Sequence, residues 1–236
     1  NFPANLRTRE TADLFMALII KLLKDKGRAA VVLPDGFLFG EGMKTRLKEK
    51  LLTECNLHTI VRLPNGVFSP YTGIKTNLLF FTKGKPTETI WFYEHPYPDG
   101  VKNYNKTKPM RFAEFQPEID WWENRQATEQ AWCVNFAELK TNAEAKAKPY
   151  WQHADTLKQQ AAHNGITPAE KLALLNQAKE QQQAGDAIYN AIFNLDCKNP
   201  HKIEQDSHDP EILLSHYTEQ QQEIEEEIEK YQNFSD

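Results

Sequence analysis

The chain has 236 residues, of which 40% are hydrophobic and 26% charged, with a net charge of −5 and a mean hydropathy of −0.67. This length allows one large domain or two modest ones, and the low hydropathy predicts that part of the chain is solvated helix or tail. No apolar run is long enough for a membrane span, no secretory leader pattern is visible, and three widely spaced cysteines exclude a disulfide scaffold or zinc ribbon. We therefore expect a cytoplasmic protein with no membrane contact and no metal site.

The charge is unevenly distributed. Residues 1–84 hold 13 Lys and Arg against 7 Asp and Glu, whereas residues 196–236 hold 3 against 12. A basic first third suits a polyanion, and an acidic tail suits a basic partner. Ordinary solvated surfaces also explain both patterns, and charge alone favours that simpler interpretation.

The first 63 residues predict alternating helices and strands. Residues 11–26 carry a wide apolar stripe at helical spacing, with Asp13 in the first turn and Gly27 as a left-handed stop. Residues 29–33 are continuously apolar, which is typical of a strand buried on both faces in a parallel sheet. A second helix over 41–54 and a second strand over 57–63 follow. This order predicts half of a doubly wound α/β sheet.

A third strand is predicted over residues 76–82. The gap after Leu63 is too short for a helical crossover, so this strand should run antiparallel to the preceding one. Residues 90–93 predict a further edge strand.

The remainder of the chain has a different character. Residues 95–140 are rich in proline and aromatic side chains and predict an irregular segment held to the sheet by Trp121, Trp122 and Trp132. Residues 141–185 are rich in helix-forming residues. A final helix is predicted from Asp209, and its apolar residues approximate a heptad seam: Leu213, Tyr217, Ile224, Ile228 and Tyr231.

The residues alone do not form a complete active-site signature. The chain contains no glycine-rich phosphate loop, no HExxH and no His/Cys cluster with metal spacing. Its seven histidines are scattered and suit surface or packing positions.

Four sequence blocks carry more information together than separately. These are TRETADLF (8–15), GRAAVVLPDG (27–36), VRLPNGVF (61–68) and GIKTNLLFF (73–81). In this order and spacing they resemble the modification (methyltransferase) subunit of type I restriction-modification systems, an N6-adenine DNA methyltransferase that uses S-adenosylmethionine. The resemblance is close over residues 1–84 and looser at Asn199-Pro200-His201 and the acidic last helix.

The resemblance implies a fold and a division of the chain. The family's sheet is Rossmann-like and mostly parallel, with one antiparallel strand near its edge, and a mainly helical C-terminal region follows. We therefore expect the C-terminal half of the catalytic domain in residues 1–94, a connecting segment in 95–140, and a helical region for subunit association in 141–236. The family's acidic, glycine-containing cofactor motif and its Asn-Pro-Pro-Phe motif are absent from this sequence. The chain thus resembles a fragment that binds no cofactor and is inactive alone.

The resemblance also suggests site residues. Enzymes of this class extrude the target adenine, and an aromatic residue before the antiparallel strand stacks on it; here that is Phe68, with Tyr71 as its neighbour. Phe68 as a core plug at a strand end is an equally good interpretation. Residues Pro34, Asp35, Gly36 and Phe37 should border the active-site cleft, although they also suit a simple turn. Lys75 and Asn77 are weaker candidates for DNA contact.

The expected partners are DNA, the specificity subunit and the restriction subunit. The tail seam would pack against helices of the specificity subunit, or alternatively fold back on residues 168–195. A non-enzymatic helical adaptor with an α/β scaffold is a competing function, and a methyltransferase of similar fold acting on RNA or protein is a third.

Overall fold

The computed structural model describes residues 10–163 and 165–202. The chain divides into two units, Asn1–Asn199 and Pro200–Asp236, and all the helices and strands with described bounds belong to the first. The predicted seam residues, from Leu213 to Tyr231, lie outside the described residues. The predicted boundaries at residues 94 and 140 stay predictions.

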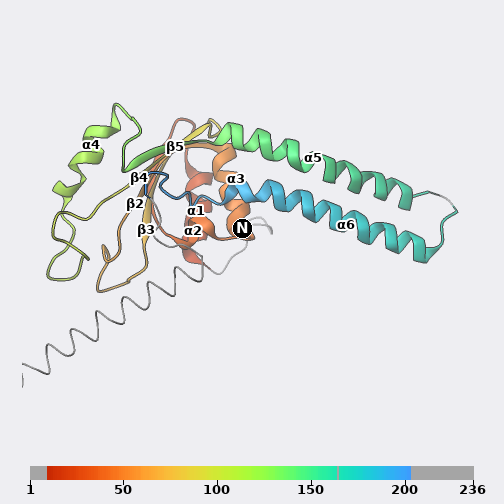
Figure 1. Cartoon of the computed structure of the whole chain (residues 1–236), viewed down its shortest axis with the longest axis horizontal. Coiled ribbons are helices and arrows are strands. Elements are labelled where there is room, and N and C mark those ends of the chain that lie inside the picture. The colour runs from red at the N-terminus through yellow and green to blue at the C-terminus, as the bar shows by residue number, and fades with distance from the viewer. Residues whose placement is uncertain (1–9, 164, 203–236) are drawn as a thin grey trace, which may run out of the picture. The chain divides into compact units, whose positions relative to one another are not determined.

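The centre of the first unit is a five-stranded mixed sheet (Figure 1). Its strand order is β1-β3-β2-β4-β5, with β1 Arg28–Pro34, β2 Cys55–Arg62, β3 Thr76–Lys83, β4 Thr89–Glu94 and β5 Ala131–Asn135. β3 runs antiparallel to both β1 and β2, while β2 and β4 are parallel. The predicted α/β class and the antiparallel direction of the third strand are therefore confirmed.

The far side of the sheet holds a strand that the sequence did not predict. β5 pairs antiparallel with β4, so β4 is an interior strand and not the predicted edge. Trp132 of β5 stacks on Phe92 of β4 with 5.4 Å between ring centroids. The sheet thus has a second antiparallel strand within the proline- and aromatic-rich segment.

β1 does not have the burial that its apolar run predicted. It is an edge strand of the described sheet, paired only with β3, and alternate residues are exposed. Val32 is 49% exposed, whereas Leu33 is buried. Continuous apolarity is typical of strands covered on both faces, whereas the alternating exposure of β1 shows that the described residues cover one of its faces.

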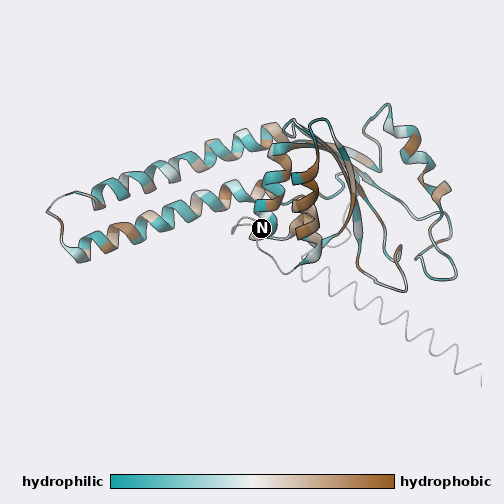
Figure 2. Cartoon of the chain, turned by 180° about the vertical axis from the view of Figure 1, so that it is seen from behind, coloured by the Kyte–Doolittle hydropathy of each residue, from teal (hydrophilic) through white to brown (hydrophobic). Residues whose placement is uncertain are grey.

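Two amphipathic helices cover one face of the sheet. α1 (Thr11–Leu22) and α3 (Met43–Glu54) bury side chains such as Ile20 and Leu51 against the strands, together with the short α2 (Gly36–Phe39). Figure 2 shows the apolar character of this layer. α1 ends four residues earlier than predicted, and Lys26, not Gly27, adopts the left-handed conformation with φ +60°.

The other face of the sheet is covered by the connecting segment. It contains the short η2 (Phe112–Phe115) and α4 (Gln116–Trp122). Trp121 packs edge-on against Trp91 and Tyr93 of β4, and Trp122 packs against Phe80 of β3. Trp121 and Trp122 therefore hold this segment to the sheet, as predicted from the sequence.

A long antiparallel helical hairpin follows β5. It consists of α5 (Phe136–Ala161) and α6 (Pro168–Asn190), and η3 (Ala191–Phe193) returns the chain to the sheet (Figure 1). Small residues such as Ala147 and Ala154 of α5 and Ala178 of α6 are buried, which lets the helices approach closely. Figure 2 shows that most of the hairpin surface is hydrophilic. Among the described residues, no helix combines the length and apolarity needed to cross a membrane.

Candidate functional site

The candidate site residues lie at one edge of the sheet, the one formed by the ends of the strands and not by an outer strand. β1 and β2 end there, and β3 begins there, because β3 runs antiparallel to both. Backbone hydrogen bonds join the three chain segments: Asp35 N donates to Lys75 O at 2.8 Å, and Leu63 N donates to Thr76 O at 3.0 Å. The loops that follow β1 and β2 are therefore held against the start of β3.

A polar network fixes this edge. Asn77 is 1% exposed, and its Nδ2 donates to Asp35 Oδ1 at 2.9 Å. Arg62 at the end of β2 reaches the same Asp35 oxygen, with Nη2 at 3.5 Å. The sequence predicted Asp35 and Asn77 as separate site residues, and the structure brings them into direct contact.

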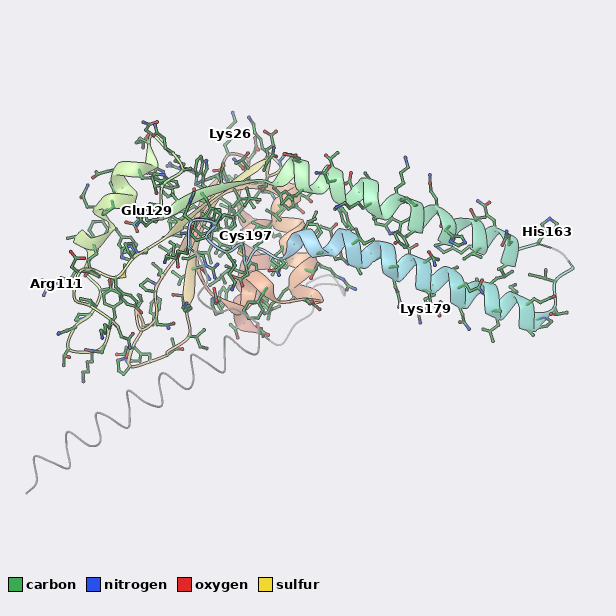
Figure 3. All side chains as sticks on the ribbon, in the orientation of Figure 1. Lys26, Arg111, Glu129, His163, Lys179 and Cys197 are labelled. Atoms are coloured by element: carbon green, nitrogen blue, oxygen red, sulfur yellow. The ribbon has the colours of Figure 1, made fainter. Side chains whose placement is uncertain are left out.

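Arg62 also holds the returning chain after the helical hairpin. Its Nη2 lies 2.6 Å from Asp196 Oδ1, and its Nη1 donates to the carbonyl of Cys197 at 3.1 Å. Figure 3 shows Cys197 beside the sheet. Sequence reasoning missed both Arg62 and Asp196 as site residues. A charged residue that ends an apolar strand before Pro64-Asn65-Gly66 was the available signal for Arg62, but nothing in the sequence indicated its distant partner.

The loop after β1 contributes little surface beyond its first residues. Pro34, Asp35 and Gly36 are half-buried, whereas Phe37 is 1% exposed and belongs to the main hydrophobic core under α1 and α3. Phe37 therefore supports the loop from beneath and offers no side-chain surface to a ligand.

The loop between β2 and β3 presents two aromatic side chains to solvent. Its turn is closed by Ser69 N donating to Gly66 O at 3.0 Å and Tyr71 N donating to Phe68 O at 2.9 Å. Phe68 is 39% exposed and Tyr71 is 93% exposed. Val67, not Phe68, packs against the hydrophobic cluster on the α4 face. Both rings are thus accessible at the edge formed by Asp35, Arg62 and Asn77.

The two predicted DNA-contact residues lie in different environments. Lys75 is exposed at the end of the same loop. Asn77 is buried and its amide is bonded to Asp35. In this arrangement Lys75 is available to a phosphate, and Asn77 acts as part of the supporting network.

The face covered by α4 holds an apolar groove and a buried ion pair. The groove has a volume of about 450 Å³ and lies between the sheet and the segment 112–123, with Leu78, Phe80 and Trp122 among its walls. Beside it, His95 Nδ1 pairs with a Glu118 oxygen, and both side chains are at most 5% exposed. Among the described residues, no group of three His, Cys, Asp or Glu is placed to hold a metal ion.

Proteins similar to this chain are DNA methylases and methylase subunits. The family model described as N-6 DNA Methylase matches residues 2–160, about two thirds of the chain. The chain is 56% identical over 224 residues to the type I restriction enzyme EcoEI methylase subunit of Escherichia coli, which covers 95% of this chain and 37% of that protein. It is 36% identical over 156 residues to the EcoKI methylase subunit of E. coli K12, covering 60% of this chain and 29% of that protein.

Solved structures of proteins from type I restriction-modification systems are also similar to this chain. The modification subunit of a type I restriction enzyme from Vibrio vulnificus YJ016 matches with a TM-score of 0.57 and 50% identity over 58% of this chain and 30% of that chain. A structure from a study of complex assembly in the type I restriction-modification system matches with a TM-score of 0.59 and 26% identity, over 97% of this chain and 40% of that chain. The chain spans little more than a third of the EcoEI relative's length. On the family match and these likenesses, the chain belongs to the N-6 DNA methylase family, and within it to the modification subunits of type I restriction-modification systems.

Proposed function

We propose that a protein containing this chain transfers a methyl group from S-adenosylmethionine to the N6 amine of adenine in DNA, as the modification subunit of a cytoplasmic type I restriction-modification system. The observation that carries the proposal is the 56% identity to the EcoEI methylase subunit over 95% of the chain. The family match over residues 2–160 supports the same activity.

The described residues contribute to base capture in this proposal. Extruding an adenine from the duplex costs a few kcal/mol, and stacking on an aromatic ring returns about 1 to 3 kcal/mol. Phe68 is the stacking residue, and Tyr71 extends the aromatic surface. Their exposure at the carboxyl end of β2, where ligands of open α/β sheets bind, supports this assignment.

Arg62, Asp35 and Asn77 act as positioning residues. Their network fixes the start of β3 and the end of β1 relative to the loop that carries Phe68. Pro34 and Gly36 then form the half-buried rim of the cleft.

The methyl donor is assigned no residue of this chain. The polar side chains at the edge do not fit a donor pocket, because Asp35 is engaged by Asn77 and Arg62, and Arg62 is engaged by Asp196. S-adenosylmethionine would supply the transferred methyl group when bound by other parts of the protein.

Methyl transfer tests the proposal directly. The intact protein, assembled with its specificity subunit, should transfer labelled methyl from S-adenosylmethionine to adenine in duplex DNA, and the 236-residue chain alone should not. RNA or protein as the only methylated acceptor would contradict the DNA assignment. No transfer by the intact assembly to any acceptor would favour the adaptor function.

Phe68→Ala tests the stacking role. We expect methyl transfer to fall roughly 5- to 150-fold, corresponding to about 1 to 3 kcal/mol of lost stacking. With 2-aminopurine in place of the target adenine, the fluorescence rise on base extrusion should be reduced. Tyr150→Ala on α5, equally exposed at 39%, is the matched control and should leave both signals unchanged. Normal methylation by Phe68→Ala would remove Phe68 from the site.

The tail is proposed as a contact for the specificity subunit, and the restriction subunit as a further component of the assembly. Deleting residues 209–236 should prevent assembly of the modification and specificity subunits, measured by size-exclusion chromatography with light scattering. Assembly of the truncated protein at the wild-type affinity would contradict this role.

A further inference from the structure

A long loop without helix or strand leaves the candidate site edge beside the loop that carries Phe68. It comprises residues 95–111, between the end of β4 and the start of η2. Because β4 is parallel to β2, this loop and the β2–β3 loop begin at the same edge of the sheet (Figure 1). Loops of this length inside a compact unit are commonly functional.

The loop has a defined conformation. Asn105 and Lys108 exchange two backbone hydrogen bonds of 3.1 and 3.2 Å, and Asn105 Oδ1 accepts from the backbone N–H of Thr107 at 3.0 Å. At its end, Arg111 N donates to Glu114 Oε1 at 2.8 Å, and Tyr104 Oη donates to the same carboxylate. The side chains of this loop therefore project from a fixed backbone.

The loop packs directly on the β2–β3 loop. Tyr97 Oη donates to the carbonyl of Asn65 at 3.0 Å. Gly66 has φ +79°, and a Cβ there would lie 2.4 Å from both Asn103 Oδ1 and the Tyr104 carbonyl. This close approach requires glycine. The two loops thus form one continuous surface that carries Phe68 and Tyr71.

This surface holds positive charge that no carboxylate neutralises. Its exposed cations are Lys75, Lys102, Lys106, Lys108 and Arg111, and none of them forms an ion pair with a described residue. Figure 3 shows Arg111 in this region. The two loops contain one acidic residue, Asp99. Elsewhere in the unit, cations such as Lys44 and Lys83 are paired with carboxylates.

We propose that the 95–111 loop binds the DNA phosphate backbone beside the target base and thereby positions the duplex for Phe68. This inference rests on the proposed function. A row of unpaired cations beside exposed aromatic rings matches a ligand that combines phosphates with bases. The loop would contact phosphates and not the bases, so it would contribute equally to the affinity for every DNA sequence.

Salt dependence of DNA binding tests the inference in the intact protein assembled with its specificity subunit. The test variant carries Lys102→Gln, Lys106→Gln, Lys108→Gln and Arg111→Gln. Each lost phosphate contact reduces the slope of log K against log salt by about 0.9, so we expect a slope smaller by roughly 2 to 4. Affinity at low salt should fall about 10-fold or more, for DNA with and without the recognition site. A second variant with Lys102, Lys106 and Lys108 each changed to Arg keeps the charge and should keep the wild-type slope.

The matched control removes four exposed cations at the opposite edge of the sheet, through Lys21→Gln, Lys24→Gln, Arg28→Gln and Lys85→Gln. These residues lie near the start of β1 and the end of β3, so the control should retain the wild-type slope. Absence of DNA binding by the wild-type assembly would refute the proposed function itself. If the wild-type assembly binds DNA and the loop variant shows the same salt slope, the inference is overturned and the proposed function stands. The inference is also overturned if the loop variant binds DNA normally but no longer assembles with the specificity subunit.

Discussion

At the scale of single residues, Arg62 joins three parts of the chain that are far apart in sequence. It contacts Asp35 after β1, Asp196 after the helical hairpin, and the carbonyl of Cys197. The side chains of Arg62, Asp35 and Asp196 are about three-quarters or more buried, at 17%, 24% and 22% exposure. Removing one charge from such a group leaves the others unpaired in a poorly solvated place.

We therefore expect Arg62→Ala to lower the free energy of unfolding by about 1 to 3 kcal/mol, the lower value reflecting solvent screening. Arg62→Lys should cost less, because it keeps the charge and loses the forked geometry. Urea unfolding of both variants measures this. Arg46→Ala on α3, an exposed arginine, is the control and should cost little. Equal stability of Arg62→Ala and the control would show that the network contributes nothing.

His58 gives a pH dependence. Burial, followed by the nearby charge of Arg125, lowers the pKa of His58 from 6.5 to about 4. The unfolded chain keeps the ordinary pKa and takes up a proton first, so this contribution to stability is complete above pH 6.5 and is lost as the pH falls through 4.

His58→Gln should flatten the stability profile between pH 6.5 and 4 relative to the wild type. The measurement is urea unfolding at intervals across this range. His153→Gln, an exposed histidine on α5, should retain the wild-type slope. An unchanged slope in His58→Gln would mean that the pKa of His58 is the same in the folded and unfolded states.

At the scale of elements, local signals predicted much of the sheet. The direction of β3 followed from a connection too short for a crossover, and α3 followed from apolar spacing. β5 was missed because five residues in a proline- and aromatic-rich segment give no clear alternation. The predicted burial of β1 on both faces was wrong because an apolar run indicates a preference for cover, and the described residues cover one face of this strand.

The candidate site was predictable only in part. The rule that ligands bind beyond strand ends predicted Asp35 at the cleft, and the family resemblance indicated Phe68, with Lys75 in the same loop-to-strand region. The Arg62–Asp196 contact joins residues more than a hundred positions apart, and no local pattern specifies such a contact. The basic loop was not predicted, because its segment was described only as rich in proline and aromatic residues, and its packing on Gly66 depends on the parallel pairing of β2 and β4.

The helical hairpin depends on one close approach. Gly185 of α6 faces Trp151 of α5, and a Cβ at Gly185 would lie 2.6 Å from Trp151 Nε1 and 2.7 Å from its Cδ1. The ring is fixed, since Nε1 donates to Asp186 Oδ1 at 2.9 Å. In a free helix, replacing Gly with Ala increases helix stability by up to about 1 kcal/mol. A decrease in stability on Gly185→Ala would therefore report the close contact with Trp151.

We expect Gly185→Ala to reduce the free energy of unfolding by about 1 to 2 kcal/mol and Gly185→Val by about 3 kcal/mol, because the ring must move. Hydrogen exchange of α5 and α6 amides should accelerate together. Ala187→Val, exposed on the same helix, is the control and should cost less than about 1 kcal/mol. A stabilising Gly185→Ala would show that the helices separate without cost.

At the scale of the whole molecule, the described sheet ends in two outer strands, β1 and β5. The β1 edge presents free backbone groups with exposed apolar side chains nearby. Val32 is 49% exposed, and on the neighbouring α1 Phe15 and Leu22 are 58% and 69% exposed. An apolar, unprotected edge strand pairs readily with another strand.

The free edge of β1 predicts how the 236-residue chain behaves by itself. We expect it to self-associate at micromolar concentration, and Val32→Lys to suppress this, because a charge on an edge strand opposes pairing. Sedimentation velocity over a concentration series is the measurement. Leu172→Lys on α6 removes an equally exposed apolar side chain (61%) away from the sheet and should leave self-association unchanged. If both lysine variants are as associated as the wild type, association does not proceed through β1.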